Sequence, residues 1–194
     1  MSAGYLDDQG IVPNSGFQRY SARLKADYQV KPWLKLGSNV SFTHYDSREQ
    51  DTEGGISNAN IFYASNIMGS IYPMYIRDAQ GNIMTDNRGF QRYDYGKKGQ
   101  DTNGSRNTIP NANPLASYML DKMKYSGDVV SGKWFADVDI WGGIKAKVNI
   151  GVDANNVRNT DMVNPFYGQY SETTGVGGLI SVSTQRTFSV NQQY

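Results

Sequence analysis

Long segments in which apolar and polar side chains alternate one by one restrict this chain to β-structure. The clearest apolar series occupies every second position from Tyr20 to Val30, with polar residues between. Successive side chains of a strand point to opposite faces, so this alternation predicts strands with one apolar and one polar face. Five such strands are expected, at residues 17–30, 33–45, 128–141, 144–155 and 179–191.

The length of these strands favours a membrane-spanning β-barrel. Strands of globular proteins have about 5–6 residues, whereas a tilted strand needs about 9–11 residues to cross a bilayer. Tyr20 and Tyr28 bracket Ala22, Leu24 and Ala26 on one face, as in an apolar band flanked by aromatic girdles. The alternative is a soluble β-sandwich, a carbohydrate-binding or adhesin module, that buries the same faces between two sheets and binds sugar with loop aromatics.

The connections between the expected strands are of two kinds. Lys31-Pro32 and Gly142-Gly143 form short turns, beside Trp33 and Trp141. Long polar loops are expected at about 46–127 and 155–175, with short helices near 58–68 and 115–122. Short turns at one end and long loops at the other are typical of outer-membrane barrels, whose long loops are extracellular.

Composition excludes several classes of function. The chain has 194 residues, a net charge of +1, no Cys and a single His, His44. Disulfides, thiolate metal sites, a Cys nucleophile and multi-His metal sites are therefore excluded, and the balanced charge argues against nucleic-acid binding. Asp137 and Asp139 could pair as in a glycosidase, but we interpret them as polar residues of a barrel lumen. We expect no enzyme activity, no catalytic residues, no metal and no cofactor.

Several blocks of sequence resemble one family of membrane transporters. They are Gly4-Tyr5-Leu6-Asp7, Phe17–Leu24, Trp33–Ser41, Asn113-Pro114 and Ile150-Gly151-Val152-Asp153. In this order they are similar to the SusC/RagA family of TonB-dependent outer-membrane transporters from Bacteroidetes.

The resemblance implies a 22-stranded barrel with an N-terminal plug, in contact with outer-membrane lipid. Such a transporter imports oligosaccharides or peptides with a SusD-like surface lipoprotein and is energised by TonB–ExbB–ExbD through the plug. The chain lacks the family's plug, so residues 1–194 are expected to be an internal barrel fragment, all-β and antiparallel, of about five strands with long extracellular loops.

Aromatic residues of the expected extracellular loops are candidates for contact with a substrate or partner. They are Tyr72, Tyr75, Tyr93, Tyr95, Tyr118, Phe166, Tyr167 and Tyr170. Tyr supplies a large contact area with few rotatable bonds. Among these residues we select Tyr93 and Tyr95 with their neighbours Arg92 and Asp94. Basic residues of the lumen face are expected to hold the plug or line water: Arg19, Arg23, Lys25, Lys145 and Lys147.

Overall fold

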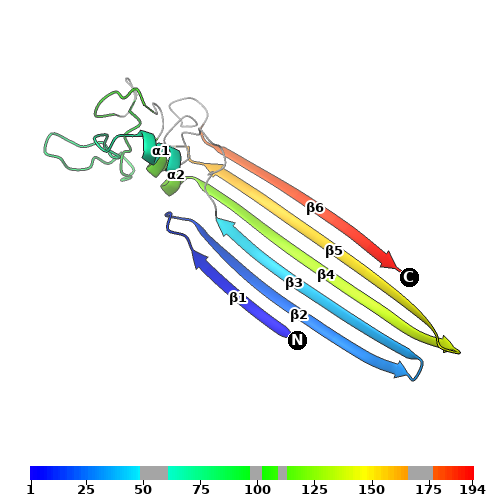
Figure 1. Cartoon of the computed structure of the whole chain (residues 1–194). Helices are drawn as coiled ribbons and strands as arrows, with labels where there is room; N and C mark the ends of the chain where they lie inside the picture. Colours follow the sequence, from blue (N-terminus) through cyan, green and yellow to red (C-terminus); the bar gives the residue numbers. More distant parts are fainter. Residues whose placement is uncertain (49–60, 97–101, 109–112, 166–176) are drawn as a thin grey trace.

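The computed structural model describes residues 1–48, 61–96, 102–108, 113–165 and 177–194. Six antiparallel strands form one open sheet in chain order (Figure 1). They are β1 (Ser2–Gln9), β2 (Gly16–Lys31), β3 (Leu34–Arg48), β4 (Lys122–Trp141), β5 (Ile144–Val163) and β6 (Leu179–Gln193). Two short helices, α1 (Ile61–Ile67) and α2 (Pro114–Leu120), lie with the long connections at one end of the sheet. The predicted all-β antiparallel fold class is confirmed.

The register of the strands brings like residues together across the sheet. One row of paired positions runs Leu24, Val40, Gly132, Val152 and Val190. The adjacent row runs Lys25, Asn39, Lys133, Gly151 and Asn191. Because neighbouring rows point to opposite faces, the sheet has one apolar face and one polar face.

The apolar face is exposed rather than packed. Leu24 is 56% exposed and Phe188 66%. In the described part of the chain a single sheet is present and no second sheet covers this face. The described residues therefore do not form the β-sandwich of the alternative, because a sandwich stabilises its fold by burying such a face between two sheets.

The polar face of the sheet is hollowed. Residues of five strands, β2 to β6, line the hollow, and we call this face the concave face. We call the opposite, apolar face the convex face. The β4–β5 turn consists of Gly142 and Gly143, with φ of 60° and 84°. Both angles are positive, as a two-residue hairpin turn of the I′ type needs, and glycine adopts them without strain.

The structure extends the expected strands at the loop end. β3 continues to Arg48, β4 begins at Lys122 and β5 continues to Val163. The loops expected at 46–127 and 155–175 are correspondingly shorter, at 49–121 and 164–178. Alternation does not reveal these extensions, because polar side chains occupy both faces there while the backbone pairing continues.

A sixth strand, β1, was not among the five expected. It pairs with β2 along its whole length, from Ser2 opposite Arg23 to Gln9 opposite Gly16. Its sequence, SAGYLDDQ, lacks a regular alternation, so backbone pairing with its neighbour determines its conformation.

The helix expected near 58–68 is α1, although residues 58–60 lie outside the described residues. The helix expected at 115–122 is α2, which ends at Leu120 because β4 begins at Lys122.

No helix in the described ranges is both long enough and apolar enough to cross a membrane.

Candidate functional site

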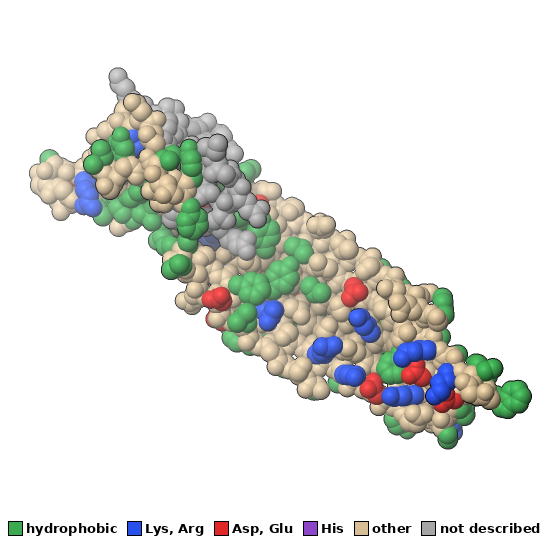
Figure 2. Space-filling model, in the orientation of Figure 1, with side chains coloured by type: hydrophobic (Ala, Val, Ile, Leu, Met, Phe, Trp, Pro, Cys, Tyr) green, Lys and Arg blue, Asp and Glu red, His purple; other side chains and the backbone are tan. Residues whose placement is uncertain are grey.

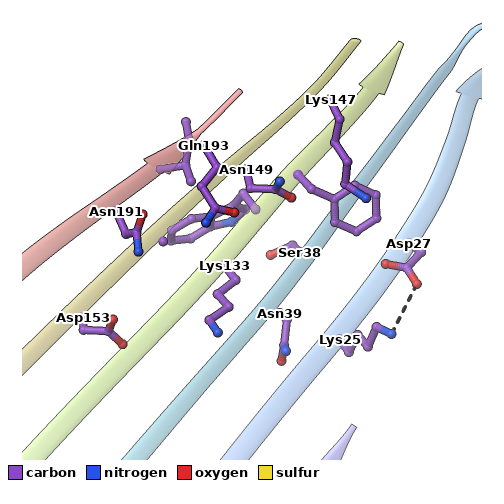
Figure 3. Close-up of a pocket in the computed structure, with 14 residues that line it drawn as sticks. Lys25, Asp27, Ser38, Asn39, Lys133, Lys147, Asn149, Asp153, Asn191 and Gln193 are labelled. Atoms are coloured by element: carbon purple, nitrogen blue, oxygen red, sulfur yellow. Dashed lines mark ion pairs between the residues drawn. The ribbon is translucent and has the colours of Figure 1, made fainter. Parts of the chain in front are cut away.

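The polar concave face contains a hollow of about 640 Å³ near the turn end of the sheet. Figure 3 shows Lys25, Asn39 and Lys133 on neighbouring strands, with Asn149, Asp153, Asn191 and Gln193 continuing the lining across β5 and β6. Ammonium and amide groups line this surface together with two carboxylates and two aromatic rings. It can therefore hold water and donate hydrogen bonds to polar or anionic groups.

The charged side chains of the concave face form ion pairs, some between adjacent strands and one along a single strand. The Lys147 ammonium lies 3.5 Å from Asp137 Oδ1, and the Lys145 ammonium 3.1 Å from Asp139 Oδ1. Lys25 lies 3.7 Å from Asp27 Oδ2. Figure 2 shows basic and acidic side chains intermixed at the turn end of one face of the sheet. The two aspartates considered for glycoside cleavage are therefore each paired with a lysine, as expected for a polar wall.

Phe135 covers a glycine in the middle of this charged wall. A Cβ on Gly37 would clash with the Phe135 ring, which lies directly over the Gly37 backbone. The Lys35 and Lys147 ammonium groups lie 5.8 and 5.5 Å from the centre of the same ring, within cation–π range. The glycine thus makes room for an aromatic platform between two lysines.

The long β3–β4 connection folds into a small body of its own, which contains the buried apolar core of the described chain. Tyr93, Tyr95 and Ala116 form that core, with Tyr75 and Leu115 among the residues packed against it. Backbone hydrogen bonds from Ile76 to Arg92 and from Arg92 to Met84, each 2.9 Å, tie its short extended segments together. We call residues 61–121 of this connection the loop body, within the ranges described.

Asp94 is the polar centre of the loop body. Its side chain is 1% exposed overall and accepts hydrogen bonds from Gly96 N at 2.7 Å, Thr102 Oγ1 at 3.0 Å and Asn103 N at 2.8 Å. The buried Arg106 guanidinium lies 3.7 Å from Asp94 Oδ1. Burial lowers the pKa of Arg106, and the charge of Asp94 opposes that change. A buried carboxylate with this many donors holds loop segments together.

Asn113 connects α2 to the same centre. Its Oδ1 accepts from Ala116 N at 3.1 Å, which caps the helix. Its Nδ2 donates to Met74 O at 2.8 Å and to Asp94 O at 2.9 Å. Pro114 follows at the first helical position, where the missing N–H costs nothing. The Asn113-Pro114 pair in the sequence is thus a helix start fixed to the loop core.

The structure buries three of the four residues selected from the sequence for ligand contact. Tyr93 and Tyr95 belong to the core, Asp94 is the polar centre, and Arg92 is half-buried. The sequence shows that these residues carry aromatic and hydrogen-bonding groups, but not that they pack inward. Contact between Arg92, Tyr93, Asp94 or Tyr95 and a ligand stays a prediction. Phe166, Tyr167 and Tyr170, three further loop aromatics, lie outside the described residues.

Other loop-body side chains face outward and were missed by the sequence analysis. Phe62 is 57% exposed, Ile71 84% and Phe90 47%. Exposed apolar side chains of this size suit contact with another molecule. The sequence signal that indicates such outward-facing residues is an apolar residue beside a turn. Phe90 is an example, since it follows Gly89, whose φ is 85°. Among the described residues, no three acidic or His side chains are grouped to hold a metal ion.

Three comparisons with known proteins bear on this arrangement. No family model matches the chain. A segment of 55 residues, 28% of the chain, is 33% identical to the TonB-dependent receptor P39 of Formosa agariphila and covers 5% of that protein. The structure resembles the RagAB peptide importer in its "closed-closed" state, with a TM-score of 0.57 and 18% identity over 97% of this chain and 19% of that chain.

The fold is therefore that of a stretch of the importer's chain, about a fifth of its length. The chain spans about a twentieth of the curated relative that it matches. At 18% identity the likeness concerns the fold.

Proposed function

We propose that this chain forms part of the barrel wall of a TonB-dependent outer-membrane importer of the SusC/RagA type. The convex face contacts lipid, the concave face lines the lumen, and the loop body lies on the extracellular side. The chain contributes binding surface and a conduit rather than catalysis. The uptake of oligosaccharides or peptides, a SusD-like lipoprotein partner and energy supply through TonB belong to this proposal.

One observation carries the proposal: an exposed apolar face on strands of up to 20 residues. Leu24, Val148 and Ile150 are exposed on it while their neighbours Lys25, Lys147 and Asn149 lie on the hollow face. In water such a face would be an aggregation surface. In a bilayer it stabilises the insertion of the strand by about 25 cal/mol per Å² of apolar area.

The arrangement of the connections supports the same orientation. The two short turns, at Pro32-Trp33 and Gly142-Gly143, lie at one end of the sheet, and the loop body lies at the other (Figure 1). In outer-membrane barrels the short turns are periplasmic and the long loops extracellular. The match to a TonB-dependent receptor and the fold shared with a peptide importer fit this orientation.

Uptake measurements test the proposal. Cells with and without the gene are supplied with fluorescent oligosaccharides and fluorescent oligopeptides, and accumulation is measured with and without a protonophore. We expect loss of the gene to abolish uptake of one of these classes, and the protonophore to abolish the same uptake in cells that have the gene. Uptake of both classes that is unchanged without the gene would contradict the proposal.

A further inference from the structure

The convex face carries a group of basic side chains just beyond its apolar band, at the loop end. They are Arg48 on β3, Lys124 on β4, Arg158 on β5 and Arg186 on β6. We call these four residues the basic belt. All four are exposed. They come from four consecutive strands, and their even positions place them on the same face as Leu24 and Val148.

The register fixes how far the basic belt lies from the apolar band. The last apolar row consists of Phe42, Val130, Ala154 and Phe188. Arg186 lies two residues beyond this row, Arg158 four, and Arg48 with Lys124 six. At about 3.3 Å per residue and a tilt of about 40° these positions stand roughly 5, 10 and 15 Å above the band. Long basic side chains on such strands reach lipid headgroups.

Like charges are adjacent in the basic belt. Arg48 and Lys124 are directly opposite each other on paired strands, an arrangement that destabilises a sheet unless a counter-charge is present. Lys124 contacts Asp46 at 3.0 Å. Arg48, Arg158 and Arg186 form no ion pair with the described residues. The belt therefore has an excess of positive charge at the surface.

Three acidic side chains lie on this part of the face, and each has a partner: Asp7 on β1 accepts hydrogen bonds from Tyr5 and Gln18. Asp128 lies 2.7 Å from His44 Nδ1, and Asp46 lies 3.8 Å from His44 Nε2 as well as close to Lys124. Toward the other end of the band the same face carries Ile140 and Ile144, beyond which Trp141 is 84% exposed. Lys31 lies there at a register irregularity beside the turn. The cationic excess is thus concentrated at the loop end.

We propose that the basic belt binds the phosphate groups of anionic glycolipid in the outer leaflet around the barrel. This inference rests on the proposed function, because it needs the convex face to be in an outer membrane. Phosphates at headgroup height supply the counter-charge that Arg48 lacks and add to the one that Asp46 gives Lys124. Arg can also bind phosphate with two parallel hydrogen bonds. The occupant is the lipid leaflet rather than a soluble anion, since the belt continues the lipid-facing surface.

The test uses the protein extracted whole from outer membranes in mild detergent. Binding of diphosphorylated lipid A, and of the same lipid after removal of its phosphates, is measured by native mass spectrometry. We expect the phosphorylated form to bind more tightly. The double variant K124Q/R158Q should bind it about 25-fold more weakly, since each basic residue near an anionic surface contributes about 1 kcal/mol, or about fivefold.

Two matched variants make the result specific. K133Q/K147Q removes the same charge from the same two strands but on the concave face, and its lipid A affinity should stay within about twofold of the wild type. K124R/R158K keeps the charge of the basic belt and should retain binding. Equal binding of both lipid forms, or equal losses in K124Q/R158Q and K133Q/K147Q, would overturn the lipid site.

Failure of this inference and failure of the proposed function are distinguishable. Membrane fractionation and the uptake assay are run on the same cells. Wild-type protein that is found in the outer membrane and supports uptake, yet ignores lipid A phosphates, would refute only the lipid site. Wild-type protein that is absent from the outer-membrane fraction would refute the proposed function itself.

Discussion

Asn113 offers the sharpest test of how the loop body is held together. Its side chain is 2% exposed and makes three hydrogen bonds, as acceptor from Ala116 N and as donor to Met74 O and Asp94 O. Loss of a helix N-cap costs about 1 kcal/mol. Each buried hydrogen bond contributes about 1 kcal/mol. Replacement of Asn113 by Ala should therefore destabilise the loop body by about 3 kcal/mol.

The two carbonyls that lose Asn113 keep other partners, which limits the effect. Met74 O still accepts from Asp94 N at 3.0 Å, and Asp94 O still accepts from Arg106 at 3.4 Å. The full penalty for an unsatisfied buried carbonyl thus does not apply. In hydrogen–deuterium exchange, Asn113→Ala should raise exchange of the α2 amides about 100-fold. Exchange in the apolar band of β3 and β4, away from the loop body, should stay unchanged.

Asn113→Asp separates the helix cap from the link to the core. Asp and Asn are equally good N-caps, so a residue that served only as a cap would tolerate this change. In the structure the Asn113 amide nitrogen faces two carbonyl oxygens, and a carboxylate there would be repelled. Asn113→Asp should therefore be at least as damaging as Asn113→Ala. Near-wild-type exchange in Asn113→Asp would refute this reasoning, and the exposed Asn87→Ala serves as the control.

Three further predictions follow from the strands and the turns. Leu24→Arg places a charge in the apolar band and should cost about 2–4 kcal/mol if Leu24 lies at the bilayer midplane, measured as less heat-stable, folded protein in outer membranes. Gly37→Leu should displace the Phe135 ring and cost about 1–3 kcal/mol, seen as a changed aromatic environment in near-ultraviolet circular dichroism. Hydrogen bonds from the Asn82 side chain and backbone lower the pKa of Asp78. The 78–82 turn should therefore be stable at neutral pH and lose this stabilisation as pH falls through the lowered pKa, measured by amide protection factors from pH 7 to pH 2.

The sequence predicted the strands best where the two faces meet different surroundings. Around Leu24 and Val148 one face is apolar and the other polar, so alternation marks the strand. Beyond His44 and Asn155 polar and apolar side chains are mixed on both faces, and the pattern disappears although Asp46 still pairs with Ser126 and Arg158 with Thr184. Strand ends outside the apolar band therefore depend on backbone pairing, which composition does not reveal.

The loop body was the least predictable part of the chain. Asp94 lies between Tyr93 and Tyr95. Its hydrogen-bond partners Thr102 and Asn103 come later in the chain, and the helix cap Asn113 comes later still. No periodicity links these positions. A Tyr in a polar loop can face inward or outward with equal ease, because its ring is apolar and its hydroxyl polar. The inward direction emerges only from the three-dimensional packing.

Accessibility of single cysteines in intact outer membranes tests the central claim most directly. The chain has no Cys, so each introduced thiol is unique within it. Leu24→Cys and Val148→Cys report on the convex face, and Lys25→Cys and Lys147→Cys on the concave face. We predict that a lipid-soluble maleimide labels the first pair and that a water-soluble maleimide labels the second. The opposite pattern, or water-soluble labelling of all four, would contradict a barrel wall with its apolar face in lipid.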